Sequence, residues 1–69
     1  MPAGADRYEI VVRGRLSGGL DLALNEFAIE PRPGATALSG DFLDQAHLRD
    51  TLDRLADFGL EVVSVDAVG

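Results

Sequence analysis

The 69-residue sequence contains no cysteine, no lysine and no tryptophan. Without cysteine, the chain cannot form a disulfide, a thiolate zinc site, an iron–sulfur cluster or a cysteine nucleophile. A metal ion would have only oxygen ligands and one imidazole available. Long apolar runs are also missing, since none approaches the roughly 18 residues that a membrane-spanning helix needs. We therefore expect no cofactor, no metal and no membrane partner.

Positive charge is scarce as well, because six arginines stand against twelve acidic residues and give a formal net charge of −6. Binding to nucleic acid depends on clustered basic side chains that neutralise phosphates. The nearest approach to such a cluster is formed by three arginines of one segment, Arg7, Arg13 and Arg15. The sequence therefore predicts no nucleic acid partner.

The length of the chain allows one domain, which we place at residues 7–69 after a flexible N-terminus at 1–6. A core of this size gives only marginal stability by itself, and oligomerisation is the supplement that we expect. The opening sequence MPAGAD has neither the basic nor the apolar region of an export signal, which predicts a cytoplasmic location.

Alternating apolar residues in YEIVVRGRL, residues 8–16, predict a half-buried strand whose outward side carries Val11, Arg13 and Arg15. Residues 19–25 fit a strand and a helix face equally well, and we favour a short helical turn followed by a strand at 26–31. Pro33 and Gly34 then predict a hairpin turn. Since Pro31 has no N–H to donate, the strand that contains it is expected at a sheet edge.

The longest predicted helix has clearly marked ends. Asp44 is a good N-cap, and Leu43 before it can pack on the first turn. Gly59 suits the left-handed position after a helix, and Leu60 beyond it is expected to pack on Leu55. The apolar stripe between these ends consists of Leu48, Leu52, Leu55 and Ala56. A final strand is predicted in LEVVSVDAV, after the helix.

These elements predict an α+β fold, a ferredoxin-like or ACT-like βαββαβ sandwich with a very short first helix. If residues 20–24 form a strand, the alternative is a four-stranded antiparallel sheet with one helix, βββαβ. In both cases the single substantial helix covers only one face of the sheet. We expect the other face, with Val11 and Val62, or an edge of the sheet to be buried in a homodimer or against another protein.

The sequence DQAH at 44–47 is the stretch that most resembles a catalytic or metal site, because it brings the only histidine close to Asp44 and Asp50. Helix capping explains Asp44 and places His47 in the first turn, whereas a bound metal commonly needs three or four protein ligands. We therefore predict no catalytic residue and no metal site. Pro2 resembles an N-terminal proline base, but AGADR separates it from the first strand, which favours a flexible leader.

Arg13 and Arg15 are the candidate ligand-binding residues. Side chains two apart on a strand share a face, so both would point from the uncovered sheet face toward a carboxylate or phosphate. Cross-strand pairing with Glu9, Glu61 or Asp66 is the alternative that we favour.

The segments LSGDFLDQAHLRDTLDRLADFGLEVVSVDAV, residues 38–68, and YEIVVRGRL resemble a family of small bacterial proteins that is common in actinobacteria. The resemblance implies no activity. It implies aromatic residues, tryptophan above all, in the segment that matches 20–27, and a small residue in place of His47. This chain departs at both places, which makes His47 a local substitution.

We therefore expect a non-enzymatic homodimeric protein-interaction or regulatory module. The alternative is a sensor that binds an anionic metabolite at the dimer interface, and the remaining possibility is a small enzyme that uses His47 or Pro2.

Overall fold

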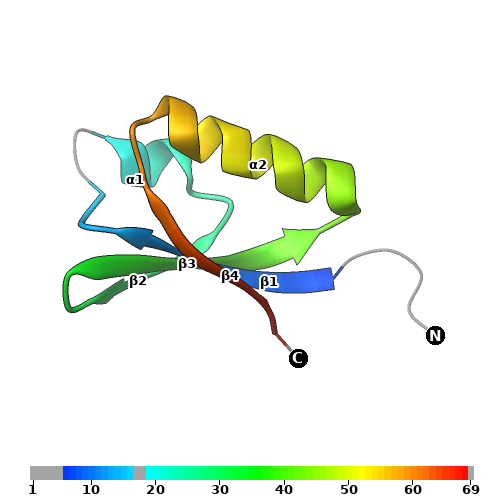
Figure 1. The fold of residues 1–69 in the computed structure, drawn as a ribbon, viewed down its shortest axis with the longest axis horizontal. Helices are drawn as coiled ribbons and strands as arrows, with labels where there is room; N and C mark the ends of the chain where they lie inside the picture. The colour runs from blue at the N-terminus through cyan, green and yellow to red at the C-terminus, as the bar shows by residue number, and fades with distance from the viewer. Residues whose placement is uncertain (1–5, 17–18, 69) are drawn as a thin grey trace.

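The computed structural model describes residues 6–16 and 19–68 (Figure 1). Its elements in chain order are β1 (Asp6–Arg13), α1 (Leu20–Ala23), β2 (Ala28–Arg32), β3 (Ala35–Phe42), α2 (Gln45–Asp57) and β4 (Val62–Ala67). The strands form one sheet in the order β2-β3-β1-β4, and all neighbouring strands are antiparallel. Both α2 and the single turn α1 lie on the same side of this sheet (Figure 1). Of the N-terminal segment expected at 1–6, residues 1–5 with Pro2 lie outside the described part of the chain, and Asp6 is the first residue of β1.

The α+β class is confirmed, and the arrangement is the four-stranded antiparallel sheet with one substantial helix. The ferredoxin-like or ACT-like βαββαβ sandwich is not supported, because α1 is a single turn of four residues and α2 is the one substantial helix on the sheet. The short helical turn that the sequence analysis favoured is confirmed at Leu20–Ala23. Leu24, whose spacing fitted both a strand and a helix face, lies just after α1, points inward and is fully buried.

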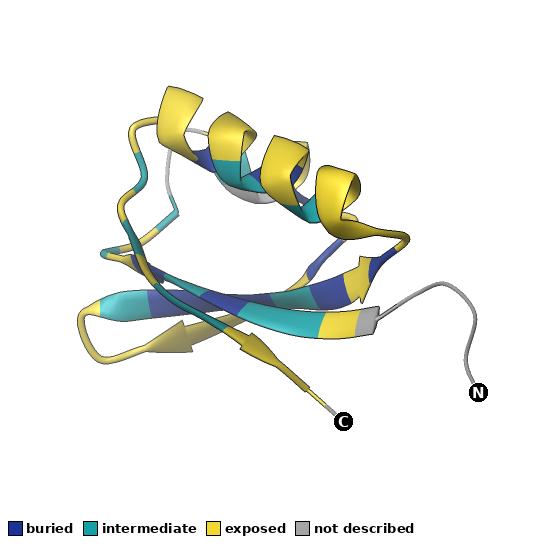
Figure 2. Cartoon of the chain, turned by 45° about the vertical axis from the view of Figure 1, so that its right-hand side comes forward, coloured by how far each residue is buried: buried dark blue, intermediate teal, exposed yellow. Residues whose placement is uncertain are grey.

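The core lies between α2 and the sheet, where the buried residues gather on the two central strands, β1 and β3 (Figure 2). Its main cluster consists of Ile10, Val12, Leu24, Phe27, Leu38, Phe42 and Leu55. Phe27 stacks on Phe42 with ring centroids 5.6 Å apart. A Cβ on Gly40 would lie 2.8 Å from the Phe27 ring, so this strand position is glycine because the ring packs directly on the backbone.

The Asp44 cap and the Gly59 end of α2 are confirmed, whereas Leu43, which was expected to pack on the first turn, is 70% exposed. The Asp44 carboxylate accepts a hydrogen bond from His47 N–H at 2.8 Å. At the other end Gly59 has φ 81°, its N–H donates to Ala56 C=O, and Leu60 N–H donates to Leu55 C=O. This pair of bonds is a Schellman motif.

The inner stripe of α2 differs from the sequence-based one at two positions. Thr51 is buried and Ala56 is exposed. Thr51 takes an inner position because its hydroxyl donates to His47 C=O at 3.0 Å, so that no polar group is left unpaired against the core. The helix therefore packs through residues at 48, 51, 52 and 55.

The edges of the sheet are β2 and β4. Pro31 lies in β2, so its predicted edge position is confirmed. On the other edge, the pairing of β4 with β1 skips a residue: Val11 is opposite Ser64, but Val12 is opposite Val62. Because of this bulge, Val62 points to the face opposite to the one that regular alternation of side chains along β4 predicts. It packs against the core cluster. The placement of Val62 on the uncovered face was therefore wrong.

Candidate functional site

His47 has structural partners on each side of the first turn of α2. Its Nδ1 accepts a hydrogen bond from Leu43 N–H at 3.2 Å, while its own N–H donates to Asp44. The ring lies against Phe42, with centroids 5.2 Å apart. His47 thus reaches back over the start of α2 as Glu or Gln does in a capping box, except that its partner is the N–H of Leu43, one residue before the N-cap. These contacts account for the DQAH sequence as a helix start.

Arg13 and Arg15 do not lie side by side. Strand β1 ends at Arg13, and Gly14 follows with φ 83°, a conformation that favours glycine and breaks the alternation of the strand. Arg13 pairs with Glu61 at 3.2 Å, one of the partners expected from the sequence. Arg15 leaves the sheet with Leu16 and lies beside the β2–β3 hairpin. The pair of arginines on one sheet face is therefore not formed.

The middle of the uncovered sheet face carries small side chains, and charged side chains lie around them. The pairing places Val11 in its middle row, between Ala37 of β3 and Ser64 of β4. A neighbouring row contains Glu9 and Asp66 opposite each other. Ion pairs cross this face, with Arg32 bound to Glu9 at 2.8 Å and to Glu30 at 3.2 Å. Val11, the predicted partner-face residue, is thus half-buried between the small side chains of Ala37 and Ser64.

The β4 edge carries apolar side chains in contact with solvent. Val63, the bulged residue, is 56% exposed, and Val68 just after the strand is 42% exposed. The opposite edge differs, because Pro31 interrupts its hydrogen-bonding pattern and Glu30 and Arg32 flank the proline. The molecule therefore has one edge that resists pairing and one that is open to it.

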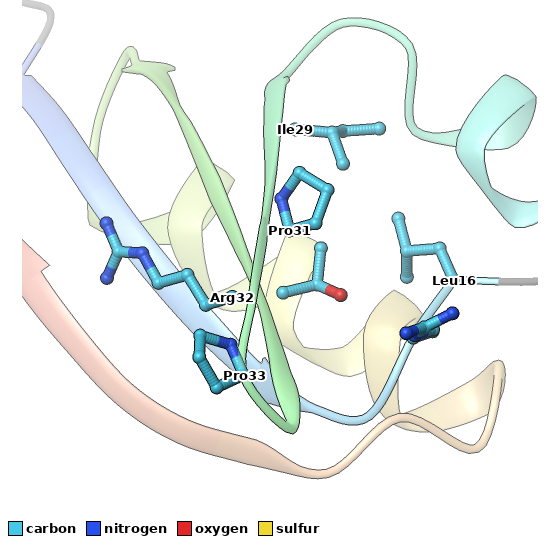
Figure 3. Close-up of a pocket in the computed structure, with 7 residues that line it drawn as sticks. Leu16, Ile29, Pro31, Arg32 and Pro33 are labelled. Atoms are coloured by element: carbon cyan, nitrogen blue, oxygen red, sulfur yellow. The ribbon is translucent and has the colours of Figure 1, made fainter.

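A cleft lies on the side of the sheet that carries α2, beyond the part that the helix covers. It is bounded by the β2–β3 hairpin and by the chain that follows β1 (Figure 3). Its volume is about 650 Å³, and it is lined by Arg15, Leu16, Ile29, Pro31, Arg32, Pro33 and Thr36. Leu16 faces Ile29 and Pro31 across the cleft, whereas the Arg32 side chain extends away from it (Figure 3). The hydrogen bond to Glu30, together with the charge of Glu9, raises the pKa of Arg32. Arg32 is thus held by carboxylates on the other side of β2.

The sequence analysis missed this cleft. The signal that points to it is Gly14, because a glycine at the end of an alternating strand allows the chain to turn. The proximity of Leu16 to residues 29–36 comes from the β1–β3 pairing, which the sequence pattern alone does not give.

A family model described as a domain of unknown function, DUF8691, matches residues 7–66. The chain belongs to the DUF8691 family. No curated protein and no solved structure matches the chain. The expectation of a family without an assigned activity is therefore confirmed, and the function of this DUF8691 domain has to be argued from its geometry.

Two further findings concern metal binding and membrane spanning. Within residues 6–16 and 19–68, no group of three or more His, Cys, Asp or Glu side chains is arranged to hold a metal ion. In the same part of the chain, neither helix has the length and apolar character needed to cross a membrane.

Proposed function

We propose that this domain is a non-enzymatic interaction module that acts as a homodimer, and that the two copies pair through their β4 edges. The observation that carries the proposal is the contrast between the edges of the sheet. The β4 edge carries exposed Val63, whereas β2 contains a proline. Among the strands that the structure describes, β4 pairs on one side only, and the other side of this six-residue strand offers backbone donors and acceptors to a second strand.

The backbone groups available for this pairing can be identified. Val68 N–H donates to Arg7 C=O at 2.7 Å, so Val68 directs its backbone toward β1. Bonding to one neighbour alternates along an antiparallel strand, so Ser64 and Asp66 share that direction. Val65 and Ala67 then direct their N–H and C=O groups toward the open edge. Two copies related by a two-fold axis would use the same groups on each strand.

The uncovered face is the less favourable surface for self-association. Docking through this face would bury Glu9, Glu30 and Asp66 of both copies, and buried charges are costly unless each acquires a partner. Edge pairing leaves these carboxylates in water. It also buries Val63 of each copy, which supplies the apolar part of the contact.

The non-enzymatic part of the proposal is supported by the contacts of His47. Both its ring nitrogen Nδ1 and its backbone N–H are engaged at the start of α2. A histidine that acts as a general base needs its basic nitrogen free to reach a substrate proton. A regulatory role, or a partner protein at the same edge, is compatible with this module.

The test is the mass of the wild-type protein in solution, measured by light scattering, together with one backbone variant. Ala67→Pro removes an N–H that points to the open edge and leaves the bonds to β1 in place, since edge positions tolerate proline. We expect the wild type to be dimeric at about 100 μM, which populates a dimer with a micromolar Kd. Ala67→Pro should be monomeric and folded.

Two controls define the outcome. Ala67→Ser keeps the N–H and should remain dimeric. Leu43→Ser removes an apolar side chain that is 70% exposed far from the edge, and it should also remain dimeric. A wild-type monomer at this concentration would contradict the homodimer. A dimer that Ala67→Pro leaves intact would place the interface elsewhere.

A further inference from the structure

The cleft beside the β2–β3 hairpin is held in shape by hydrogen bonds within the fold. Gly14 N–H donates to Gly34 C=O at 2.8 Å, and Gly14 C=O accepts from the Thr36 hydroxyl at 2.8 Å. These two bonds hold the start of the 14–16 segment against the hairpin. They fix one wall of the cleft relative to the other, so its shape does not depend on a bound molecule.

Four of the residues that line the cleft, Leu16, Ile29, Pro31 and Pro33, have side chains without hydrogen-bond donors. Leu16 and Ile29 pack partly against the core cluster and expose the rest of their side chains to the cleft. Pro31 and Pro33 have no N–H. The Thr36 hydroxyl proton is used in its bond to Gly14, which leaves the oxygen as an acceptor. An occupant would therefore contact these walls through hydrocarbon.

Of the two arginines that line the cleft, Arg15 is the one whose positive charge is available to a ligand. Arg32 is compensated by Glu9 and Glu30, and its guanidinium lies away from Leu16 (Figure 3). Arg15 is exposed and lines the cleft, and it has no ion pair with any carboxylate that the structure describes. A guanidinium binds a carboxylate through two parallel N–H···O bonds. Arg15 thus presents two donors at the rim of an apolar cleft.

We propose that this cleft binds a small monocarboxylate with an apolar body, whose carboxylate pairs with Arg15 and whose body lies against Leu16, Ile29 and Pro31. The volume of about 650 Å³ falls within the usual range of ligand pockets, about 300 to 1,000 Å³. A phosphate fits less well, because phosphate sites commonly gather several backbone N–H groups or basic side chains. The site lies within a single chain and does not depend on the proposed dimer.

Phenylacetate is a suitable probe, because it joins one carboxylate to a compact apolar ring and has a neutral isostere, phenylacetamide. We would follow the backbone amide signals of the full chain by nuclear magnetic resonance during titration. We expect saturable shifts at Leu16, Ile29 and Thr36 with phenylacetate. Phenylacetamide should bind at least about tenfold more weakly, the difference expected for losing a charge-assisted hydrogen bond.

Two variants test whether the charge of Arg15, and not the shape of the cleft alone, determines the affinity for the acid. Arg15→Gln should reduce the affinity for phenylacetate to that for phenylacetamide and leave the amide's own affinity unchanged. The side chain of Arg15 is exposed, so this variant is expected to fold, and its unperturbed spectrum checks that. Arg49→Gln, which removes an exposed arginine on α2, is the matched control and should bind as wild type does.

Several results would overturn the proposal. These are the absence of saturable binding by phenylacetate, equal affinities of the acid and the amide, and an Arg15→Gln variant that binds the acid as well as wild type. If inorganic phosphate shifted the same amide signals and bound more tightly than phenylacetate, the ligand class would be a phosphate and not a carboxylate. Shifts confined to Gln45, Leu48 and Leu52 would locate binding on α2.

Discussion

At the scale of single residues, the start of α2 uses a carboxylate and an imidazole for structure. The first N–H groups of a helix have no partner within the helix, and a side chain can supply one. Asp44 does so for the N–H of His47. His47 Nδ1 in turn accepts from the N–H of Leu43, the residue before the N-cap, so both side chains hold the chain at the start of the helix.

Substitution of Asp44 tests the capping role. Asp44→Ala should lower the free energy of unfolding by about 1 kcal/mol, because the His47 N–H loses its acceptor. Asp44→Asn retains a side-chain oxygen and should be nearly as stable as wild type. Urea unfolding at neutral pH measures both differences. Equal losses in the two variants would show that the carboxylate acts through its charge and not through the cap.

The residue scale also explains why the Asp44 helix cap was predicted from the sequence, whereas the cleft beside Arg15 was not. Asp44 caps a helix within three residues of itself, so the local sequence contains all the information. Arg15 acquires its surroundings from Gly14, Gly34 and Thr36, which are distant in sequence. The alternation of residues 8–16 placed Arg15 on the sheet because that pattern assumes a continuous strand, and the positive φ of Gly14 ends it.

At the scale of elements, α2 is tied to the segment between α1 and β2 by an ion pair. Arg54 on the outer side of the helix donates to Glu26 at 2.6 Å. This hydrogen bond is the main cause that holds the pKa of Glu26 below its ordinary value. Both side chains are about half exposed, so solvent screening limits the stabilisation to about 0.2 to 1 kcal/mol.

This ion pair predicts a pH-dependent difference between wild type and Glu26→Gln. A carboxyl group with a lowered pKa in the folded state stabilises the fold fully above its unfolded pKa, about 4.3. The stabilisation is lost as the pH falls through the lower folded-state pKa. Glu26→Gln should thus be less stable than wild type at pH 7 and equally stable near pH 3, as measured by urea unfolding. A difference that persists in acid would instead assign the effect to packing.

Strand register is the element-scale feature that the sequence did not contain. The helix ends and the hairpin turn were predictable, since their signals lie in adjacent residues such as Asp44 or Pro33 and Gly34. The position of Val62 depends on the bulge at Val63, which arises only when β4 pairs with β1. A shift of one residue reverses every side chain beyond it, so Val62 joined the core.

At the scale of the whole molecule, the net charge of −6 opposes any association of two copies. The β4 edge itself adds Asp66, and Glu61 lies just before the strand. The proposed contact uses backbone hydrogen bonds and Val63, none of which carries charge. Attraction at the edge is therefore insensitive to salt, while the repulsion between the two acidic chains is screened by it.

The proposed dimer should consequently become tighter as salt is added. The Debye length falls from about 30 Å at 0.01 M to about 10 Å at 0.1 M, which is comparable to the spacing between charges across a strand contact. We expect the dissociation constant from sedimentation equilibrium to decrease by about two- to tenfold over this range. The Ala67→Pro variant should remain monomeric throughout. A dimer that weakens with salt would require ion pairs between the copies, and Arg13 with Glu61 would then be the pair to examine, because both are exposed beside β4.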